Sequence, residues 1–261
     1  MFFRGGTIFG YINSKEYILN DINSHLISLI KLFYNNDALK IINDIQKNIE
    51  EYKLFLEIKN DKKQVNKTNY NLLKNTYNQI QNKNTYKANV MLLTLVIYGF
   101  NSQIRFNQKG EFNIPAGKQE FNDNRKQILL NFVNKIRNKN VTFSNKDFRF
   151  VYELLKTKEI DDKTFLYFDP PYLITNATYN NIWTENEEIE LLNLLDELSK
   201  NNIKWALSNV LASNGKNNQI LIEWSKKYYV HNLNKTYKNS NYQRKNNGKD
   251  WEVLITNYEN K

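Results

Sequence analysis

Apolar residues recur along this chain at two spacings, which predict alternating strands and helices. Compact apolar runs predict strands, at residues 16–23, 141–143, 165–168, 203–209 and 251–257. Apolar positions three or four residues apart predict helices, at residues 22–33, 125–138, 150–156, 185–200 and 220–227. Strands and helices that alternate in this way predict an α/β fold, in which helices cover both faces of one sheet.

The middle of the chain has a different pattern. Residues 35–89 contain no Gly or Pro, and their apolar residues fall at helical spacing within an Asn- and Lys-rich background. We predict helices here, joined by a polar stretch near residues 60–71, and a buried helix over residues 90–98. Residues 35–124 are therefore expected to be an inserted subdomain. The α/β domain is expected to comprise residues 1–34 and 125–261.

Two short alternating arms around Gln108-Lys109-Gly110 predict a β-hairpin within residues 99–117. The arms carry Arg105 and several amide side chains, interleaved with aromatic residues. Arginine can pair bidentately with guanine in the major groove, so this hairpin is a candidate reader of DNA. The alternative is a surface hairpin whose charges are simply solvated.

Composition narrows the class of protein. The net charge of +10 favours a polyanionic partner, although a chain so rich in Asn, Lys, Ile and Tyr can become basic through AT-rich coding alone. Cysteine is absent and only two histidines occur, which argues against disulfides and against a Cys or His metal site. No signal segment is visible, and the longest apolar run is too short to span a bilayer. We expect a cytoplasmic protein with no membrane and no metal partner.

The strand predicted at residues 165–168 is followed by Asp169-Pro170-Pro171-Tyr172. Consecutive prolines end a strand, because each lacks a backbone N–H and has a fixed φ. The result is a carboxylate and an aromatic ring on a stiff turn, at the strand end where α/β sheets bind ligands. The alternative is a proline turn that only stops the strand. The chain has three prolines, and two of them lie here.

Two further segments suit a nucleoside ligand. Gly5-Gly6 follows a short apolar start, and such a pair allows the backbone to approach a ligand closely. Asp21 ends the next strand, where a nucleoside-binding α/β fold places the carboxylate that binds ribose hydroxyls. The alternatives are an ordinary turn for the glycines and a helix N-cap for Asp21.

Taken in order, these motifs resemble the Dam-type (D12 class) DNA adenine-N6 methyltransferases over nearly the whole chain. The resemblance implies a Rossmann-like sheet, S-adenosylmethionine as cofactor, double-stranded DNA as substrate and a companion restriction endonuclease. It implies a catalytic group of Asp169, Pro170 and Tyr172. It implies cofactor contacts from Phe3, Gly5, Gly6, Asp21, Asp147, Phe148 and Asp169. It implies DNA contacts from Phe100, Asn101, Gln103, Arg105, Asn107, Lys109, Asn113 and Pro115.

By this family's mechanism, Asp169 and the Pro170 carbonyl accept hydrogen bonds from the adenine amino group, and Tyr172 stacks on the flipped base. Arg105 and Pro115 suggest a GATC-like site, although Gln103 replaces an apolar residue common in the family. The family also carries a basic, Gly-containing segment ahead of the glycine loop, and this chain starts almost at that loop. The alternatives are a catalytically impaired DNA-binding relic and a cytosine-N4 methyltransferase.

Overall fold

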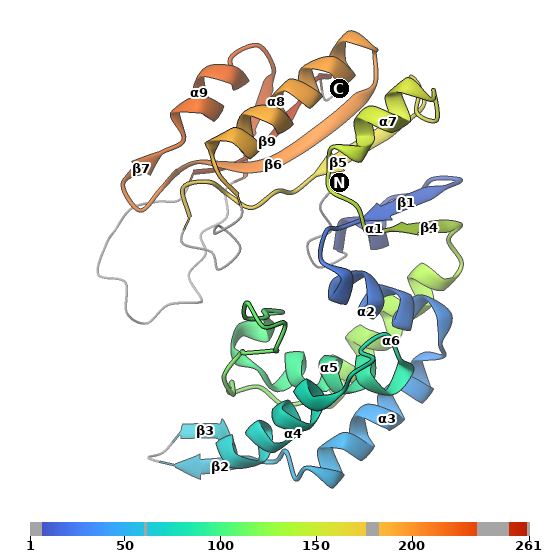
Figure 1. The fold of residues 1–261 in the computed structure, drawn as a ribbon, viewed down its shortest axis with the longest axis vertical. Helices are drawn as coiled ribbons and strands as arrows, with labels where there is room; N and C mark the ends of the chain where they lie inside the picture. The colour runs from blue at the N-terminus through green and yellow to red at the C-terminus, as the bar shows by residue number, and fades with distance from the viewer. Residues whose placement is uncertain (1–6, 60–61, 176–182, 234–250, 260–261) are drawn as a thin grey trace. The chain divides into compact units, whose positions relative to one another are not determined.

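The computed structural model describes residues 7–59, 62–175, 183–233 and 251–259. The chain forms two compact units. Unit 1 comprises residues 1–5, 19–22 and 144–261, and unit 2 comprises residues 6–18 and 23–143. Figure 1 shows the elements of each unit. The predicted cofactor residues Phe3, Gly5 and Gly6 lie outside the described residues.

Unit 1 is built on a mixed sheet. Its strand order is β5-β6-β9-β8, and the short strand β7 pairs with the end of β6. β5 runs parallel to β6, whereas β6–β9 and β9–β8 are antiparallel. The bounds are β5 (Phe165–Phe168), β6 (Lys204–Ser213), β7 (Lys216–Asn217), β8 (Tyr229–Asn232) and β9 (Trp251–Thr256).

Three helices cover one face of this sheet. They are α7 (Phe150–Lys156), α8 (Glu185–Lys200) and α9 (Gln219–Ser225), and α8 and α9 both lie along β6 (Figure 1). Alternate side chains of the strands point into the core beneath them, because successive strand residues face opposite sides. The strand residues of this core are Leu166, Phe168, Trp205, Leu207, Leu211, Val253 and Ile255. Helices on the opposite face remain a prediction.

Unit 2 is mainly helical. Its central helix is α5 (Tyr86–Tyr98), which is buried on nearly all sides and contacts α2, α3 and α4. Its apolar run is interrupted only by Thr94, which suits a helix that is surrounded by others. The other elements are α1 (Thr7–Tyr11), α2 (Ser24–Asn35), α3 (Ala38–Glu51), α4 (Lys67–Gln79), the 3-10 turn η1 (Phe100–Ser102) and α6 (Asp123–Arg137).

The compact units do not follow the predicted domain boundaries. Helices α2 and α6 pack against each other, α2 also packs against α5, and α6 also packs against α3, so both belong to unit 2. Strands β1 (Tyr17–Asn20) and β4 (Val141–Ser144) form a separate pair, and the division between units passes through both strands. The functional division of the chain into a catalytic and a recognition part stays a prediction.

One local expectation is wrong. The antiparallel strands β2 (Leu56–Lys59) and β3 (Lys62–Val65) lie just before and within the predicted polar stretch near residues 60–71, and α4 begins inside that stretch. No Gly or Pro marks the turn between the strands, so the usual turn signal is absent. The N-cap of α2 is Asn23 and not Asp21, because the Asn23 side chain accepts from the N–H groups of His25 and Leu26.

Asparagine caps explain part of the unusual composition. Asn23, Asn66, Asn122 and Asn218 each accept a hydrogen bond from the first turn of α2, α4, α6 and α9 respectively. Replacing such a cap by alanine typically costs about 1 kcal/mol, because a backbone donor loses its acceptor. The high Asn content therefore has a structural use in addition to any coding bias.

Candidate active site and DNA-contacting loop

The tetrapeptide Asp169 to Tyr172 follows β5 directly, at the carboxyl end of the parallel strand pair β5–β6. The Tyr172 hydroxyl lies 3.3 Å from Asp169 Oδ1, 3.3 Å from Ser208 Oγ on β6 and 3.4 Å from Glu252 Oε1 on β9. Thr175 holds the turn through its N–H and hydroxyl, both of which donate to the Tyr172 carbonyl. Three strands thus contribute polar groups to one position. Sequence reasoning missed Ser208 and Glu252, because no motif marks them.

Asp21 follows β1 and Asp147 follows β4. The side-chain amides of Asn20 and Asn145 join these two strand ends by hydrogen bonds. Asn20 donates to the Lys146 carbonyl at 2.8 Å and accepts from the Lys146 N–H at 2.9 Å. Asn145 donates to the carbonyls of Asp21 and of the next residue, at 2.7 and 2.9 Å. The end of β1 is thereby joined to the segment after β4, which carries Asp147.

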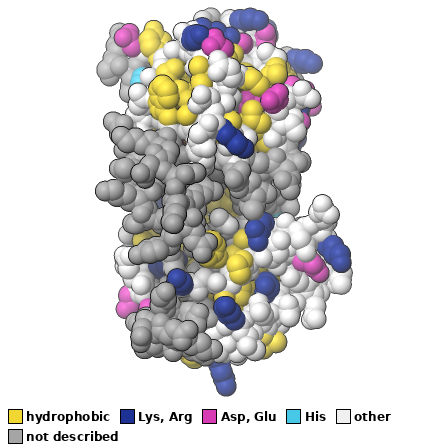
Figure 2. Space-filling model, turned by 90° about the vertical axis from the view of Figure 1, so that its left-hand side faces the viewer, with side chains coloured by type: hydrophobic (Ala, Val, Ile, Leu, Met, Phe, Trp, Pro, Cys, Tyr) yellow, Lys and Arg dark blue, Asp and Glu magenta, His cyan; other side chains and the backbone are white. Residues whose placement is uncertain are grey.

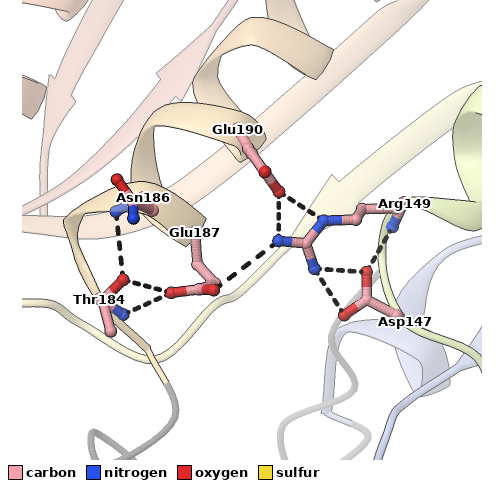
Figure 3. A network of polar contacts seen from close by, with 6 residues as sticks. All are labelled: Asp147, Arg149, Thr184, Asn186, Glu187 and Glu190. Atoms are coloured by element: carbon pink, nitrogen blue, oxygen red, sulfur yellow. Dashed lines mark hydrogen bonds and ion pairs between the residues drawn. The ribbon is translucent and has the colours of Figure 1, made fainter.

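Arg149 holds the Asp147 carboxylate (Figure 3). Its Nη1 donates to both carboxylate oxygens, at 3.0 and 3.1 Å, and its backbone N–H donates to Oδ1 at 2.9 Å. The same guanidinium binds Glu190 and lies 3.8 Å from Glu187, both on α8. Planar guanidinium groups suit this kind of multiple carboxylate contact. Asp147 is therefore fixed in place from α8, through a residue that sequence reasoning did not identify.

Phe148 is a core residue. Its side chain is 3% exposed, its ring lies 5.6 Å from that of Trp183, and the Arg149 guanidinium covers it at 4.7 Å. Because the ring is packed in this way, a cofactor would meet Phe148 chiefly through its main chain. The contact of Phe148 with the cofactor stays a prediction.

A buried carboxyl group lies beneath the site. Glu188 on α8 is 0% exposed and accepts from Trp183 Nε1 at 2.7 Å, Asn218 Nδ2 at 3.0 Å and Asn209 Nδ2 at 3.1 Å. Burial raises the pKa of Glu188, and the three hydrogen bonds oppose this shift because they favour the ionised form. Asn209 is adjacent to Ser208, so the Glu188 network holds the strand segment that faces Tyr172.

The 99–117 loop of unit 2 has two close arms. Isolated antiparallel bridges join Gly99 to Ala116 and Phe106 to Phe112, in place of the predicted regular strand ladder. At the base, a Cβ on Gly117 would come within 2.6 Å of the Gly99 carbonyl oxygen. Only glycine allows this approach, which brings the arms together.

Asn107 organises the tip of the loop. Its side-chain oxygen accepts from the N–H groups of Lys109 and Glu111, at 3.0 and 2.9 Å, and its amide donates to the Glu111 carboxylate at 2.7 Å. Gly110 has φ of +74°, a left-handed conformation that the turn requires. Asn107 therefore shapes the loop, whatever else it contacts.

Arg105 lies across the two arms. Its Nε donates to Asn113 Oδ1 at 2.8 Å and its Nη2 to the Asn113 carbonyl at 3.3 Å. Among the other predicted contact residues, Phe100, Asn101, Lys109 and Pro115 are exposed, whereas Gln103 is half-buried. Asn101 is also in the left-handed conformation, with φ of 54°.

Helices α2 and α4 support the loop. Asn78 of α4 accepts from the Phe112 N–H at 2.8 Å and donates to its carbonyl at 3.1 Å, in the manner of a strand partner. The buried Tyr70 hydroxyl donates to the Ile114 carbonyl at 3.2 Å, and the His25 ring stacks on Phe106 at 3.8 Å. Sequence reasoning missed these supports, which lie far from the loop along the chain.

The positive charge is divided unequally. Unit 2 contains twenty Lys and Arg against ten Asp and Glu, a balance of +10, whereas unit 1 contains seventeen of each. Lys and Arg side chains are visible among the described residues on the face that Figure 2 shows. The unit that carries the 99–117 loop therefore accounts for the whole net charge.

Two other kinds of site are absent from the part of the chain that the structure describes. Within residues 7–59, 62–175, 183–233 and 251–259, no group of three His, Cys, Asp or Glu side chains could hold a metal ion. No described helix is long and apolar enough to cross a membrane.

The chain belongs to the D12 class N6 adenine-specific DNA methyltransferase family, whose pattern it matches over residues 1–239.

Individual relatives show the extent of the likeness. The chain is 35% identical over 267 residues to the type II methyltransferase M.FokI of Planomicrobium okeanokoites, which covers 99% of this chain and 38% of that protein. It is 34% identical over 271 residues to the modification methylase StsI of Streptococcus sanguinis, with the same two coverages. It is 29% identical over 215 residues to the DNA adenine methylase of Salmonella typhimurium, covering 80% of this chain and 69% of that protein. The chain thus spans less than two fifths of the length of the first two relatives.

Proposed function

We propose that this chain transfers a methyl group from S-adenosylmethionine to the exocyclic N6 of adenine, within a short site in double-stranded DNA. The observation that carries the proposal is the tetrapeptide Asp169 to Tyr172 at the carboxyl end of β5, with Tyr172 in contact with Ser208 and Glu252. Family membership supports the same chemistry.

The residues near the strand ends fit this cofactor. Asp21 and Asp147 lie on segments joined by Asn20 and Asn145, and carboxylates at such strand ends suit ribose hydroxyls and an adenine amino group. Arg149 would keep Asp147 oriented for that contact. When bound, S-adenosylmethionine supplies an electrophilic methyl group on a sulfonium.

The tetrapeptide would activate the target nitrogen. The lone pair of the adenine amino group is delocalised into the ring, so the group is a poor nucleophile. Asp169 and the Pro170 carbonyl would accept its two hydrogens, which favours tetrahedral geometry and localises the lone pair. The nitrogen would form a bond to the methyl carbon as the carbon–sulfur bond of the sulfonium breaks, which would leave a neutral thioether, and it would release one proton to Asp169 or water. Positioning and preorganised acceptors lower the barrier, and no covalent enzyme intermediate is required.

We infer that unit 2 binds DNA through the 99–117 loop. Support comes from its net charge of +10 and from the mounting of the loop on Asn78 and Tyr70. Positive charge provides affinity for phosphates, whereas side chains such as Arg105 provide sequence preference. A GATC-like site and a companion restriction endonuclease are part of the same proposal, the latter because relatives are named type II and modification methylases.

Arg105 should contribute to the preference for one DNA sequence and not only to the attraction of DNA phosphates. We expect Arg105→Ala to raise the KM for specific DNA by roughly 10- to 100-fold, because a bidentate base contact is lost. Arg105→Lys keeps the charge but loses the planar fork, so it should recover little. Competition between cognate and altered duplexes measures the preference. Equal weakening on every duplex, with full recovery in Arg105→Lys, would show that Arg105 contacts phosphate only.

The proposal as a whole is tested by incubating the full chain with S-adenosylmethionine and duplex DNA. We expect N6-methyladenine in the nuclease digest, identified by mass spectrometry. Calorimetry should show cofactor binding that is lost in Asp21→Ala and Asp147→Ala and kept in Asp162→Ala, which changes an exposed carboxylate elsewhere in unit 1. N4-methylcytosine in the digest, in place of N6-methyladenine, would show that the methylated base is cytosine. DNA binding without cofactor binding would indicate a silent relic.

A further inference from the structure

Two polar side chains lie at the tetrapeptide without an assigned role. Ser208 is on β6, where it is 6% exposed, and Glu252 is half-buried on β9. In the β6–β9 register, Glu252 lies opposite Val210, two residues beyond Ser208. Residues two apart on a strand share a face, so Ser208 and Glu252 are diagonal neighbours. This face is the one opposite to the core that contains Leu207 and Val253.

The Tyr172 hydroxyl is shared among three oxygens. Its distances to Asp169, Ser208 and Glu252 are 3.3, 3.3 and 3.4 Å, each longer than the usual O–H···O separation of about 2.8 Å. A phenol has one proton, so Tyr172 can donate to only one carboxylate at a time, while its oxygen can accept from Ser208. Donation to Glu252 removes that proton from Asp169, which is the acceptor proposed for the substrate amino group.

We propose that Ser208 and Glu252 are positioning residues for methyl transfer, which hold the Tyr172 hydroxyl and so fix where its ring lies. This inference rests on the proposed function. The hydroxyl oxygen lies on the axis of the second side-chain torsion, so an anchor there mainly restricts the first torsion, which swings the whole ring. Rate is sensitive to such placement, because the reacting atoms must be held in near-attack geometry. The pair also draws the hydroxyl proton toward β9 and away from Asp169.

The decisive comparison uses Tyr172→Phe, which keeps the ring and removes only the hydroxyl. We expect Tyr172→Phe, Ser208→Ala and Glu252→Leu each to lower kcat about 10-fold, the effect of one lost hydrogen bond, with KM for S-adenosylmethionine unchanged. In a double variant with Tyr172→Phe, neither Ser208→Ala nor Glu252→Leu should lower kcat further, because no hydroxyl remains to be held. Glu252→Gln keeps an acceptor oxygen and should retain most of the rate.

A spectroscopic readout separates positioning from general stability. With 2-aminopurine at the target adenine, each variant should change the fluorescence of the enzyme–DNA complex, because stacking of the flipped base on Tyr172 is altered. Ser213→Ala is the matched control, since Ser213 is a buried serine on the same strand, 3% exposed. Glu223→Ala is the carboxylate control on α9. Neither control should change kcat or fluorescence.

Three outcomes would overturn the inference. A wild-type kcat in Tyr172→Phe would show that the hydroxyl has no role. Fully additive losses in the double variants would show that Ser208 and Glu252 act elsewhere. Equal losses in Ser213→Ala would indicate a structural effect of the strand. If the unmodified chain methylates no DNA, the proposed function fails first, and this result is distinct from an active enzyme whose variants behave normally.

Discussion

Asp169→Ala should lower the rate of methyl transfer about 1000-fold, while binding of DNA persists. The expectation follows from the proposed role of the carboxylate, because removing one preorganised group that stabilises a developing charge typically costs about 100- to 1000-fold in kcat. Asp169 also has the Tyr172 hydroxyl at 3.3 Å, so its loss disturbs a second group of the site. Single-turnover incorporation of labelled methyl groups measures the rate directly.

Asp162→Ala is the control for that measurement. Asp162 is an exposed carboxylate in the turn before β5, and its removal should leave the rate within about 2-fold, as is usual for surface changes. Asp169→Asn adds a second test, since an amide keeps an acceptor oxygen but loses the charge. Near-normal rates in Asp169→Ala would exclude the tetrapeptide from catalysis.

Glu188→Ala should destabilise unit 1 strongly. The substitution leaves the buried donors of Trp183, Asn209 and Asn218 without their acceptor. Each unsatisfied buried donor costs about 1–3 kcal/mol, so we expect the free energy of unfolding to fall by about 3–5 kcal/mol after partial relaxation. Urea denaturation followed by tryptophan fluorescence is a suitable measurement. A fall in the free energy of unfolding of less than about 1 kcal/mol would show that the hydrogen bonds to Glu188 do not stabilise unit 1.

Glu188 should also make stability depend on pH. Burial raises its pKa above the ordinary 4.5, so between that value and the folded-state pKa the native protein binds more protons than the unfolded chain. The free energy of unfolding from this group is therefore greatest below about pH 4.5 and is lost as pH rises through the folded-state pKa. Glu188→Gln, which cannot titrate, should lack this slope.

Glu185→Ala separates the network from simple charge effects. Glu185 is exposed in the first turn of the same helix, where a negative charge interacts favourably with the helix dipole by about 0.3–1 kcal/mol. Its removal should cost no more than that amount. An equal loss in Glu185→Ala and Glu188→Ala would show that helix charge, and not the buried hydrogen bonds, is responsible.

Local patterns predicted most of the regular structure. Helices such as α8 and the strand β5 were expected at their observed residues, because periodicity and caps act over a few neighbouring residues. The strands β2, β3 and β8 were not expected. Their pairing partners, and not their own composition, make them strands, and no Gly or Pro marks the β2–β3 turn.

In the candidate active site, too, local patterns reveal residues close together in sequence but not contacts made through strand pairing. Asp169 and Tyr172 are adjacent in sequence and stand out as a motif, whereas Ser208 and Glu252 reach Tyr172 only through the pairing of β5, β6 and β9. Arg149 could have been suspected from its closeness to Asp147 in the chain, but its contacts with α8 could not.

The order of short motifs and the stiff proline turn are enough to predict the class of chemistry, because both depend on covalent and local constraints. How those motifs are held is visible only in the folded chain. The fold joins Asp21 to the Asp147 segment through Asn145, mounts the 99–117 loop on Asn78, and assigns the net charge to one unit. These are contacts between residues 30 or more positions apart, which arise from packing and strand register and leave no signature in the local pattern.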